Sequence, residues 1–137
     1  MCMVQDGTKI LVQDRIKSWC GIAFPGGHIE EHESIVDSVI REIYEETGLT
    51  ISNPRLCGVK QWFKDGMRNI CFLFKADKFS GTLKSNDEGR NFWIERADLS
   101  KNKLASNFDI MLKVFENDEI SEHYHERMFD DSEDILK

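Results

Sequence analysis

Three glutamates near the middle of the chain have the spacing of a metal-binding group. Glu42, Glu45 and Glu46 are three and four residues apart, and on a helix they fall within one arc of about 100°. Such side chains are neighbours on a helix surface. Carboxylates at the C-terminal end of a helix oppose its dipole, so helix stability alone does not favour them there. A hard divalent cation such as Mg²⁺, which prefers oxygen ligands, accounts for the cluster. A solvated acidic face, with Arg41 paired to Glu45, and an acidic patch for a partner are the alternatives.

A helix is predicted over residues 34–47, where it would carry these glutamates. Its apolar residues recur at the spacing of one helix face, and we expect them to face the core: Val36, Val39, Ile40 and Ile43. Gly48 follows as a C-cap, and Pro25-Gly26-Gly27 breaks the preceding apolar run. A solvated acidic face explains neither this glycine turn nor Glu33.

The rest of the chain predicts a mixed sheet between two or more helices, an α/β class without the regular repeat of a doubly wound parallel sheet. We expect strands near residues 3–5, 8–15, 19–24 and 91–95, and a hairpin of 55–63 with 69–75. A second helix is predicted over 108–115. Residues 79–89 read as a polar loop. The polar tail from residue 116 is assigned no element, and only its last few residues are expected to fray.

Length and composition favour one domain spanning residues 1–137. No apolar run approaches the roughly 20 residues of a membrane span, and no signal peptide is expected. The first candidate strand begins almost at once, so we expect nothing to precede the domain. The four cysteines (Cys2, Cys20, Cys57 and Cys71) are widely spaced and are expected to be reduced and buried in a cytoplasmic protein. A net charge of -7 argues against duplex nucleic acid bound through a basic surface.

The glutamates also complete a longer motif. Gly27, five residues, Glu33, seven residues and then REIYEETGL from Arg41 to Leu49 match every fixed position of GX5EX7REUXEEXGU, where U is aliphatic. The chain therefore resembles the Nudix hydrolases. FPGG at 24–27, GTLKSNDEGRNFWI and LASNFDIML are similar to the MutT-type, nucleotide-pool-cleaning branch. The resemblance implies a mixed-sheet α/β/α sandwich. It also implies hydrolysis of a nucleoside diphosphate linked to a group X, with Mg²⁺ or Mn²⁺ required.

The resemblance assigns roles around the metal. Glu45 and Glu46 would be its core ligands, joined by the backbone carbonyl of Gly26. Glu42 would bind metal or activate the attacking water. Glu33 and Arg41 would lock the loop to the helix through a planar ion pair. A further acid is expected from the polar loop, at Glu88 or at its neighbour Asp87. We expect these groups to form a pre-assembled Mg²⁺ site.

It also implies a set of substrate contacts. Arg15 would face a phosphate, with a strand-end charge as the alternative. Asn107 would read the purine edge, with a helix N-cap as the alternative. Phe24 would line the base pocket or pack in the core. Gly27 and His28 are further candidates in the box loop.

The remaining aromatic and histidine residues are not assigned a definite role in the site. His123 and His125 are expected at the surface, without a zinc site. Trp19, Trp62 and Trp93 could stack on a base or fill the core.

The leading function hypothesis is a MutT-like diphosphatase that converts 8-oxo-dGTP into its monophosphate and pyrophosphate, as a monomer or homodimer. Hydrolysis of an ADP-sugar, a dinucleoside polyphosphate or an RNA 5′ end is the alternative. The downstream proline common in ADP-ribose hydrolases is missing, since the chain has only Pro25 and Pro54. A non-catalytic Nudix-fold sensor is a remote third hypothesis, because such proteins usually lose the box glutamates that are present here.

Overall fold

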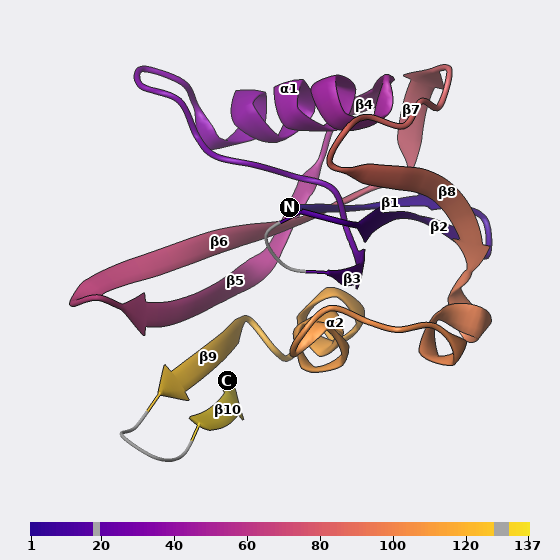
Figure 1. Cartoon of the computed structure of the whole chain (residues 1–137). Helices are drawn as coiled ribbons and strands as arrows, with labels where there is room; N and C mark the ends of the chain where they lie inside the picture. Colours follow the sequence, from indigo (N-terminus) through magenta and orange to yellow (C-terminus); the bar gives the residue numbers. More distant parts are fainter. Residues whose placement is uncertain (18–19, 128–131) are drawn as a thin grey trace.

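The computed structural model describes residues 1–17, 20–127 and 132–137. Along the chain the elements are β1 (Cys2–Asp6), β2 (Lys9–Arg15), β3 (Gly21–Ala23), α1 (Ile35–Thr47), β4 (Leu49–Ser52), β5 (Arg55–Lys64), β6 (Met67–Ala76), β7 (Lys78–Gly81), β8 (Gly89–Glu95), the 3-10 helix η1 (Arg96–Lys101), α2 (Phe108–Glu116), β9 (Glu122–Arg127) and β10 (Ser132–Leu136). Figure 1 shows α1 and α2 on opposite sides of the sheet.

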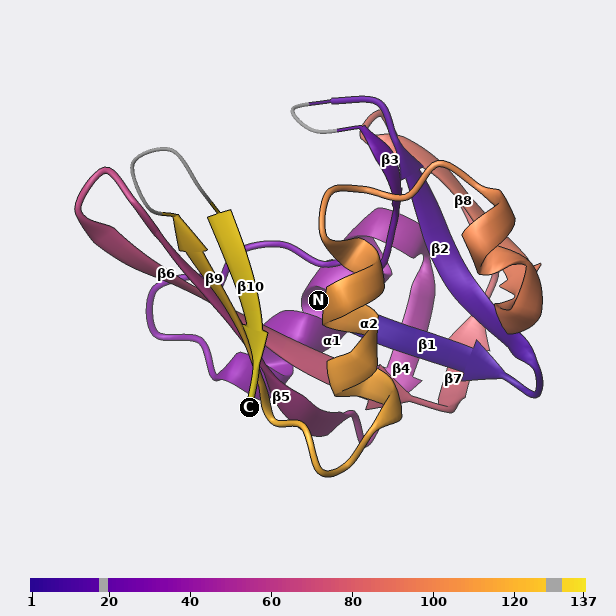
Figure 2. The ribbon, with the colours of Figure 1, turned by 90° about the horizontal axis from the view of Figure 1, so that it is seen from below.

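The main sheet is mixed, as predicted, and the fold belongs to the α+β class. Its strand order is β10-β9-β5-β6-β1-β2-β3, with β8 paired to β2, while β4 and β7 form a separate two-stranded sheet. The β1–β6 and β5–β9 pairs are parallel, and the other pairs are antiparallel. Figure 2 shows α2 against the sheet, beside β9 and β10. The sheet therefore carries one helix on each face.

Helix α1 has the predicted ends. The Ser34 hydroxyl accepts a bond of 3.0 Å from the Asp37 amide, and Gly48 adopts a left-handed φ of 74°, which glycine tolerates best. Its buried face differs from the predicted stripe. Val36 is 43% exposed, whereas Glu46 is buried. The expectation for Val36 was wrong because it lies in the first turn of the helix, where one side remains open to solvent.

Two hydrophobic clusters fill the space between the sheet and the two helices. One contains Val39 and Ile43 of α1 with Leu11, Leu49 and Phe74. The other is built around α2, and its aromatic members are Phe24, Phe108 and Phe115. The helix predicted over residues 108–115 is thus confirmed.

The predicted β5–β6 hairpin is confirmed, and its turn uses Asp65 and Gly66 at positive φ. Several other strands were not predicted. The supposed loop 79–89 begins inside β7, and the supposed featureless tail forms β9 and β10. These polar segments become strands because backbone groups of β4 and β5 pair with them, which hydrophobic patterning does not reveal.

The cysteines are free. Cys2 is buried, Cys57 and Cys71 are partly buried, and Cys20 is exposed. The expectation of burial was therefore wrong for Cys20. No helix in the described part of the chain is long and apolar enough to cross a membrane.

Candidate active site

Arg41 joins the box loop to helix α1. Its Nε and Nη2 atoms each donate to one oxygen of Glu33 at 2.8 Å, and Nη2 also donates to the His28 carbonyl at 3.0 Å. Its Nη1 atom lies 2.9 Å from Glu42 Oε1 and 3.0 Å from Glu45 Oε2. The hydrogen bonds from Arg41 lower the pKa of Glu33 to about 2. The guanidinium thus ties the loop to two of the three clustered glutamates, as the organiser role requires.

Glu46 is the buried member of the cluster, with 7% of its surface exposed. Its Oε2 atom accepts a hydrogen bond of 2.7 Å from the Gly26 amide, which fixes the carboxylate under the glycine turn. Burial raises the pKa of Glu46 to about 7, against the lowering influence of the Gly26 bond. A carboxyl group that changes charge near neutral pH is typical of a functional site.

Arg15 connects Glu46 with Glu88. Its Nη1 atom lies 3.9 Å from Glu46 Oε1, and its Nη2 atom donates to Glu88 Oε2 at 2.9 Å. Asp87 instead pairs with the exposed Lys17 at 2.5 Å. Of the two neighbouring acids in the polar loop, the structure therefore brings Glu88 to the cluster and leaves Asp87 outside.

Both glycines of the turn allow close approach. A Cβ atom on Gly27 would lie 2.3 Å from Glu42 Oε2, and one on Gly26 would lie 2.5 Å from Met1 Cα. Gly26 also has a φ of 145°, in the region that favours glycine. The backbone at residues 26 and 27 can pass between the glutamates and Met1 only because it carries no side chain there.

The donor set fits a hard cation, because carboxylate and backbone carbonyl oxygens are the ligands that Mg²⁺ prefers. Arg41 contacts one oxygen each of Glu42 and Glu45. Within the described ranges, no group of three or more His, Cys, Asp or Glu side chains is placed to hold a metal ion. The glutamates are thus not gathered around one point in this structure, and the Arg41 guanidinium supplies positive charge beside Glu42 and Glu45.

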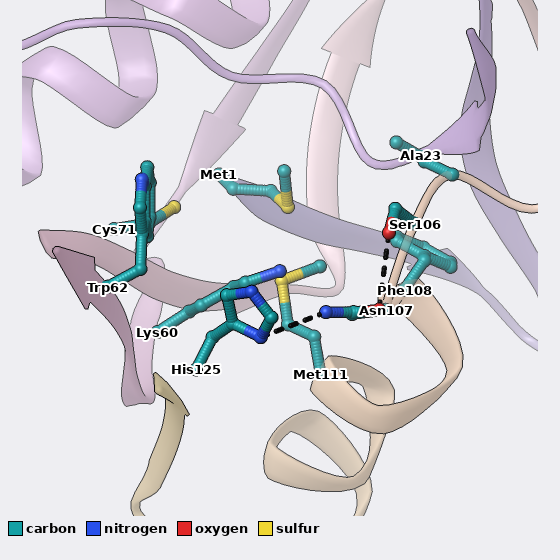
Figure 3. A pocket seen from close by; sticks show the side chains of 11 residues that line it. Met1, Ala23, Lys60, Trp62, Cys71, Ser106, Asn107, Phe108, Met111 and His125 are labelled. Carbon is teal, nitrogen blue, oxygen red and sulfur yellow. Dashed lines mark hydrogen bonds between the residues drawn. The ribbon is translucent and has the colours of Figure 1, made fainter. Parts of the chain in front are cut away.

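A pocket of about 410 Å³ opens between β5, β9 and the start of α2 (Figure 3). Trp62 and Met111 contribute apolar walls, and the polar side chains are Lys60, Ser106, Asn107 and His125. Of the other tryptophans, Trp93 packs against Phe79 with ring centroids 5.2 Å apart, and Trp19 lies outside the described residues. An aromatic plane opposite a polar edge is the surrounding that a nucleobase needs.

Asn107 occupies the N-cap position of α2 but does not cap the helix with its side chain. Its φ of 58° is left-handed, a conformation that non-glycine residues adopt with some strain. Its Nδ2 atom lies 3.2 Å from His125 Nδ1 and 3.2 Å from Asp134 Oδ1. The side chain thus lines the pocket (Figure 3), and the capping interpretation was wrong.

At four other positions the structure decides between predicted alternatives or corrects a prediction. Phe24 is fully buried and packs edge-on against Phe108 at 4.8 Å and Phe115 at 5.1 Å, so it belongs to the core. The surface prediction for His123 and His125 was wrong, because His123 is 0% exposed and His125 lines the pocket. Their strand, β9, pairs with β5. His28 is exposed, and its backbone carbonyl, not its side chain, serves the site through Arg41.

The pocket and the acidic group are adjacent. Met1 lines the pocket and also lies against Gly26, whose amide binds Glu46. Ala23 lines the same pocket and precedes the glycine turn by only two residues. A ligand with its base in the pocket can therefore extend its phosphates towards the glutamates. Trp62 was predicted either to stack on a base or to fill the core, and it lines the pocket. No such role was predicted for Lys60, His125 and Asp134, because their alignment depends on strand pairing.

Comparisons with known proteins show the family to which the chain belongs. Residues 1–115 match the NUDIX domain family. A relative from Bacillus subtilis, described as the uncharacterized Nudix hydrolase YvcI, is 35% identical over 122 residues, covering 82% of this chain and 77% of the relative.

An ADP-ribose pyrophosphatase of Methanocaldococcus jannaschii is 32% identical over 115 residues, covering 81% of this chain and 67% of the relative. The crystal structure of a mutator MutT protein from Bacillus halodurans superposes with a TM-score of 0.82 and 28% identity, covering 99% of this chain and 94% of that one. The chain belongs to the Nudix hydrolase family.

Proposed function

We propose that this Nudix hydrolase is a MutT-like diphosphatase that converts 8-oxo-dGTP into 8-oxo-dGMP and pyrophosphate. The observation that carries the proposal is the adjacency of two features. One is a pocket with an amide side chain, Asn107, on its edge. The other is the cluster of glutamates on α1, reached from the pocket through Met1 and Gly26.

At the acidic end, Glu42, Glu45, Glu46 and Glu88, with the Gly26 carbonyl, would hold Mg²⁺ or Mn²⁺. When bound, such a cation would supply positive charge for the substrate's phosphates and would make water a better nucleophile. Arg15 carries positive charge next to Glu46 and Glu88, where it would meet a phosphate of the substrate. Glu42 lies in contact with Gly27 and would orient the attacking water. Arg41 would keep the loop and the helix in register throughout.

At the base end, the orientation of the Asn107 amide favours an oxidised purine as the ligand. Its amide nitrogen faces the acceptor-only carboxylate of Asp134, so its oxygen lies on the opposite edge. In guanine and adenine, N7 is an acceptor, and two acceptors repel. In an 8-oxopurine, N7 carries a hydrogen and becomes a donor. An acceptor at Asn107 therefore favours 8-oxo-dGTP over dGTP, with Trp62 available for stacking.

ADP-ribose is the second candidate substrate. It is favoured by the 32% identical relative described as an ADP-ribose pyrophosphatase. The same edge argument opposes it, because adenine N7 is an acceptor and meets the Asn107 oxygen unfavourably.

A hydrolysis panel tests the proposal. The purified chain is incubated with Mg²⁺ and, separately, with 8-oxo-dGTP, dGTP, ADP-ribose, diadenosine polyphosphates and 5′-triphosphorylated RNA, and pyrophosphate and phosphate are detected separately. We expect the highest kcat/KM for 8-oxo-dGTP, with pyrophosphate released. Equal kcat/KM on dGTP and 8-oxo-dGTP would reject damage specificity, and a preference for ADP-ribose would establish the second candidate.

A further inference from the structure

We propose that Asp134 is a positioning residue that sets the specificity of the base pocket by fixing which edge of the Asn107 amide faces the ligand. The inference rests on the proposed function, because it concerns how the same pocket distinguishes an oxidised from a normal purine. Asp134 lies in β10, beyond the residues 1–115 that match the family domain. The antiparallel strands β9 and β10, here called the C-terminal hairpin, thereby become part of the substrate site.

Three side chains converge on a single oxygen of Asp134. Its Oδ1 atom lies 2.5 Å from His123 Nε2, 3.0 Å from His125 Nδ1 and 3.2 Å from Asn107 Nδ2. The two histidines come from β9, which pairs with β10 and, on its other side, with β5. Asn107 comes from the start of α2. One carboxylate therefore joins the hairpin to the helix that borders the pocket.

The charge states of these groups are set by their surroundings. Burial would raise the pKa of Asp134, but hydrogen bonds from His123 and His125 outweigh it and hold the pKa below its usual range. Burial lowers the pKa of His123 despite the bond to Asp134, so its ring is neutral and its one proton lies on Nε2. Asp134 is thus an ionised carboxylate that only accepts hydrogen bonds.

An acceptor-only neighbour decides the orientation of an amide. The edge of Asn107 that faces Asp134 must be its NH₂ edge, because an oxygen there would lie against the carboxylate oxygen. The amide oxygen is then held on the other edge, where the Ser106 hydroxyl lies 3.2 Å away. By the same argument His125 Nδ1 carries a proton, because it also faces the carboxylate oxygen of Asp134. Without the charge of Asp134, both Asn107 orientations become possible, and the amide can offer either a donor or an acceptor to the base.

The test is a double-mutant cycle of Asp134→Asn and Asn107→Ala. Two quantities are measured: the ratio of kcat/KM for 8-oxo-dGTP over dGTP, and the Kd of 8-oxo-dGMP and dGMP by calorimetry in EDTA. Asp134→Asn is expected to lower the ratio roughly tenfold, the equivalent of one hydrogen bond. The loss should lie in KM and Kd, with kcat nearly unchanged. In the Asn107→Ala background the same substitution should change nothing further.

Glu133→Gln is the matched control, because it removes a carboxylate from the adjacent, exposed position of the same strand; it should keep the wild-type ratio. A folded Asp134→Asn variant with an unchanged ratio, or losses that add in the double mutant, would overturn the role of Asp134. If Asp134→Asn does not fold, Asp134→Glu takes its place in the cycle. Its longer side chain shifts the carboxylate, and the ratio should fall only when Asn107 is present.

Failure of the proposed function looks different. The wild-type protein itself would then show no preference for 8-oxo-dGTP. In that case the cycle is run on the Kd of the nucleotide that the panel identifies. Non-additive losses would support the positioning role of Asp134, and additive losses would overturn it.

Discussion

The buried Glu46 carboxylate predicts an unusual dependence of stability on pH. Its residue is 7% exposed, and burial raises its pKa from the usual 4.5 to about 7. Glu46→Gln keeps the size of the side chain and an oxygen that can accept from the Gly26 amide. It removes only the charge. Any difference between variant and wild type therefore reports the free energy of placing that charge in the protein interior.

The sign follows from proton binding. Between pH 4.5 and about 7 the folded protein keeps a proton on Glu46 that the unfolded chain has lost. The contribution of Glu46 to the free energy of unfolding therefore falls as pH rises through this window, and it is constant above the window. At 1.36 kcal/mol per pKa unit, the loss amounts to roughly 3 kcal/mol. In metal-free buffer, Glu46→Gln should match wild type near pH 4.5 and exceed its free energy of unfolding by about that amount at pH 8.

Urea unfolding in EDTA, followed by circular dichroism at steps from pH 4.5 to 8, measures the difference. Glu45→Gln serves as the control, because Glu45 lies on the same helix with its side chain 56% exposed to solvent. The difference in free energy of unfolding between Glu45→Gln and wild type should not change with pH. If the difference between Glu46→Gln and wild type stays constant across this range, the burial argument for Glu46 is wrong. Mg²⁺ added at pH 8 should restore part of the lost wild-type stability, because it binds the ionised form.

Three other substitutions test the site and the core. Glu45→Gln should abolish Mg²⁺-dependent turnover while circular dichroism stays unchanged, and retained activity would remove Glu45 from the metal ligands. Arg41→Lys keeps the charge but cannot form the two-pronged contact with Glu33 at 2.8 Å, so kcat should fall roughly 10–100-fold; steady-state kinetics with a near-wild-type kcat would contradict the organiser role. Phe24→Ala should lower the free energy of unfolding by about 3–5 kcal/mol, measured by urea unfolding, and a small loss would argue against its place in the core.

The acidic end of the site was largely predictable, because it is encoded locally. Glu42, Glu45 and Glu46 lie within five residues on one helix, and helical periodicity fixes their relative directions. The Glu33–Arg41 pair is separated by only eight residues. What the pattern could not indicate is that Glu46 is buried while Glu45 is exposed. That difference depends on the glycine turn and Arg15, which pack over one side of the helix.

The base pocket was mostly not predictable. Asn107 was recognised only through resemblance, and the capping alternative seemed equally reasonable for an asparagine before a helix. Lys60, Trp62 and His125 meet because β9 pairs in parallel with β5, which aligns Trp62 with His125 in register. A polar, histidine-rich segment carries no hydrophobic alternation that would predict such a strand. The supposed surface histidines are therefore part of the pocket and its support.

The sequence by itself determined the family, the reaction class and the residues of the acidic cluster, because a helix turns a spacing along the chain into an arrangement in space. Only the tertiary structure decided which glutamate is buried, which loop acid joins the cluster, and that Asn107, His125 and Asp134 form one network. Those relations connect residues up to 73 positions apart, as in the Arg15–Glu88 pair. They depend on strand pairing and on the packing of α2, and no local pattern records either of them.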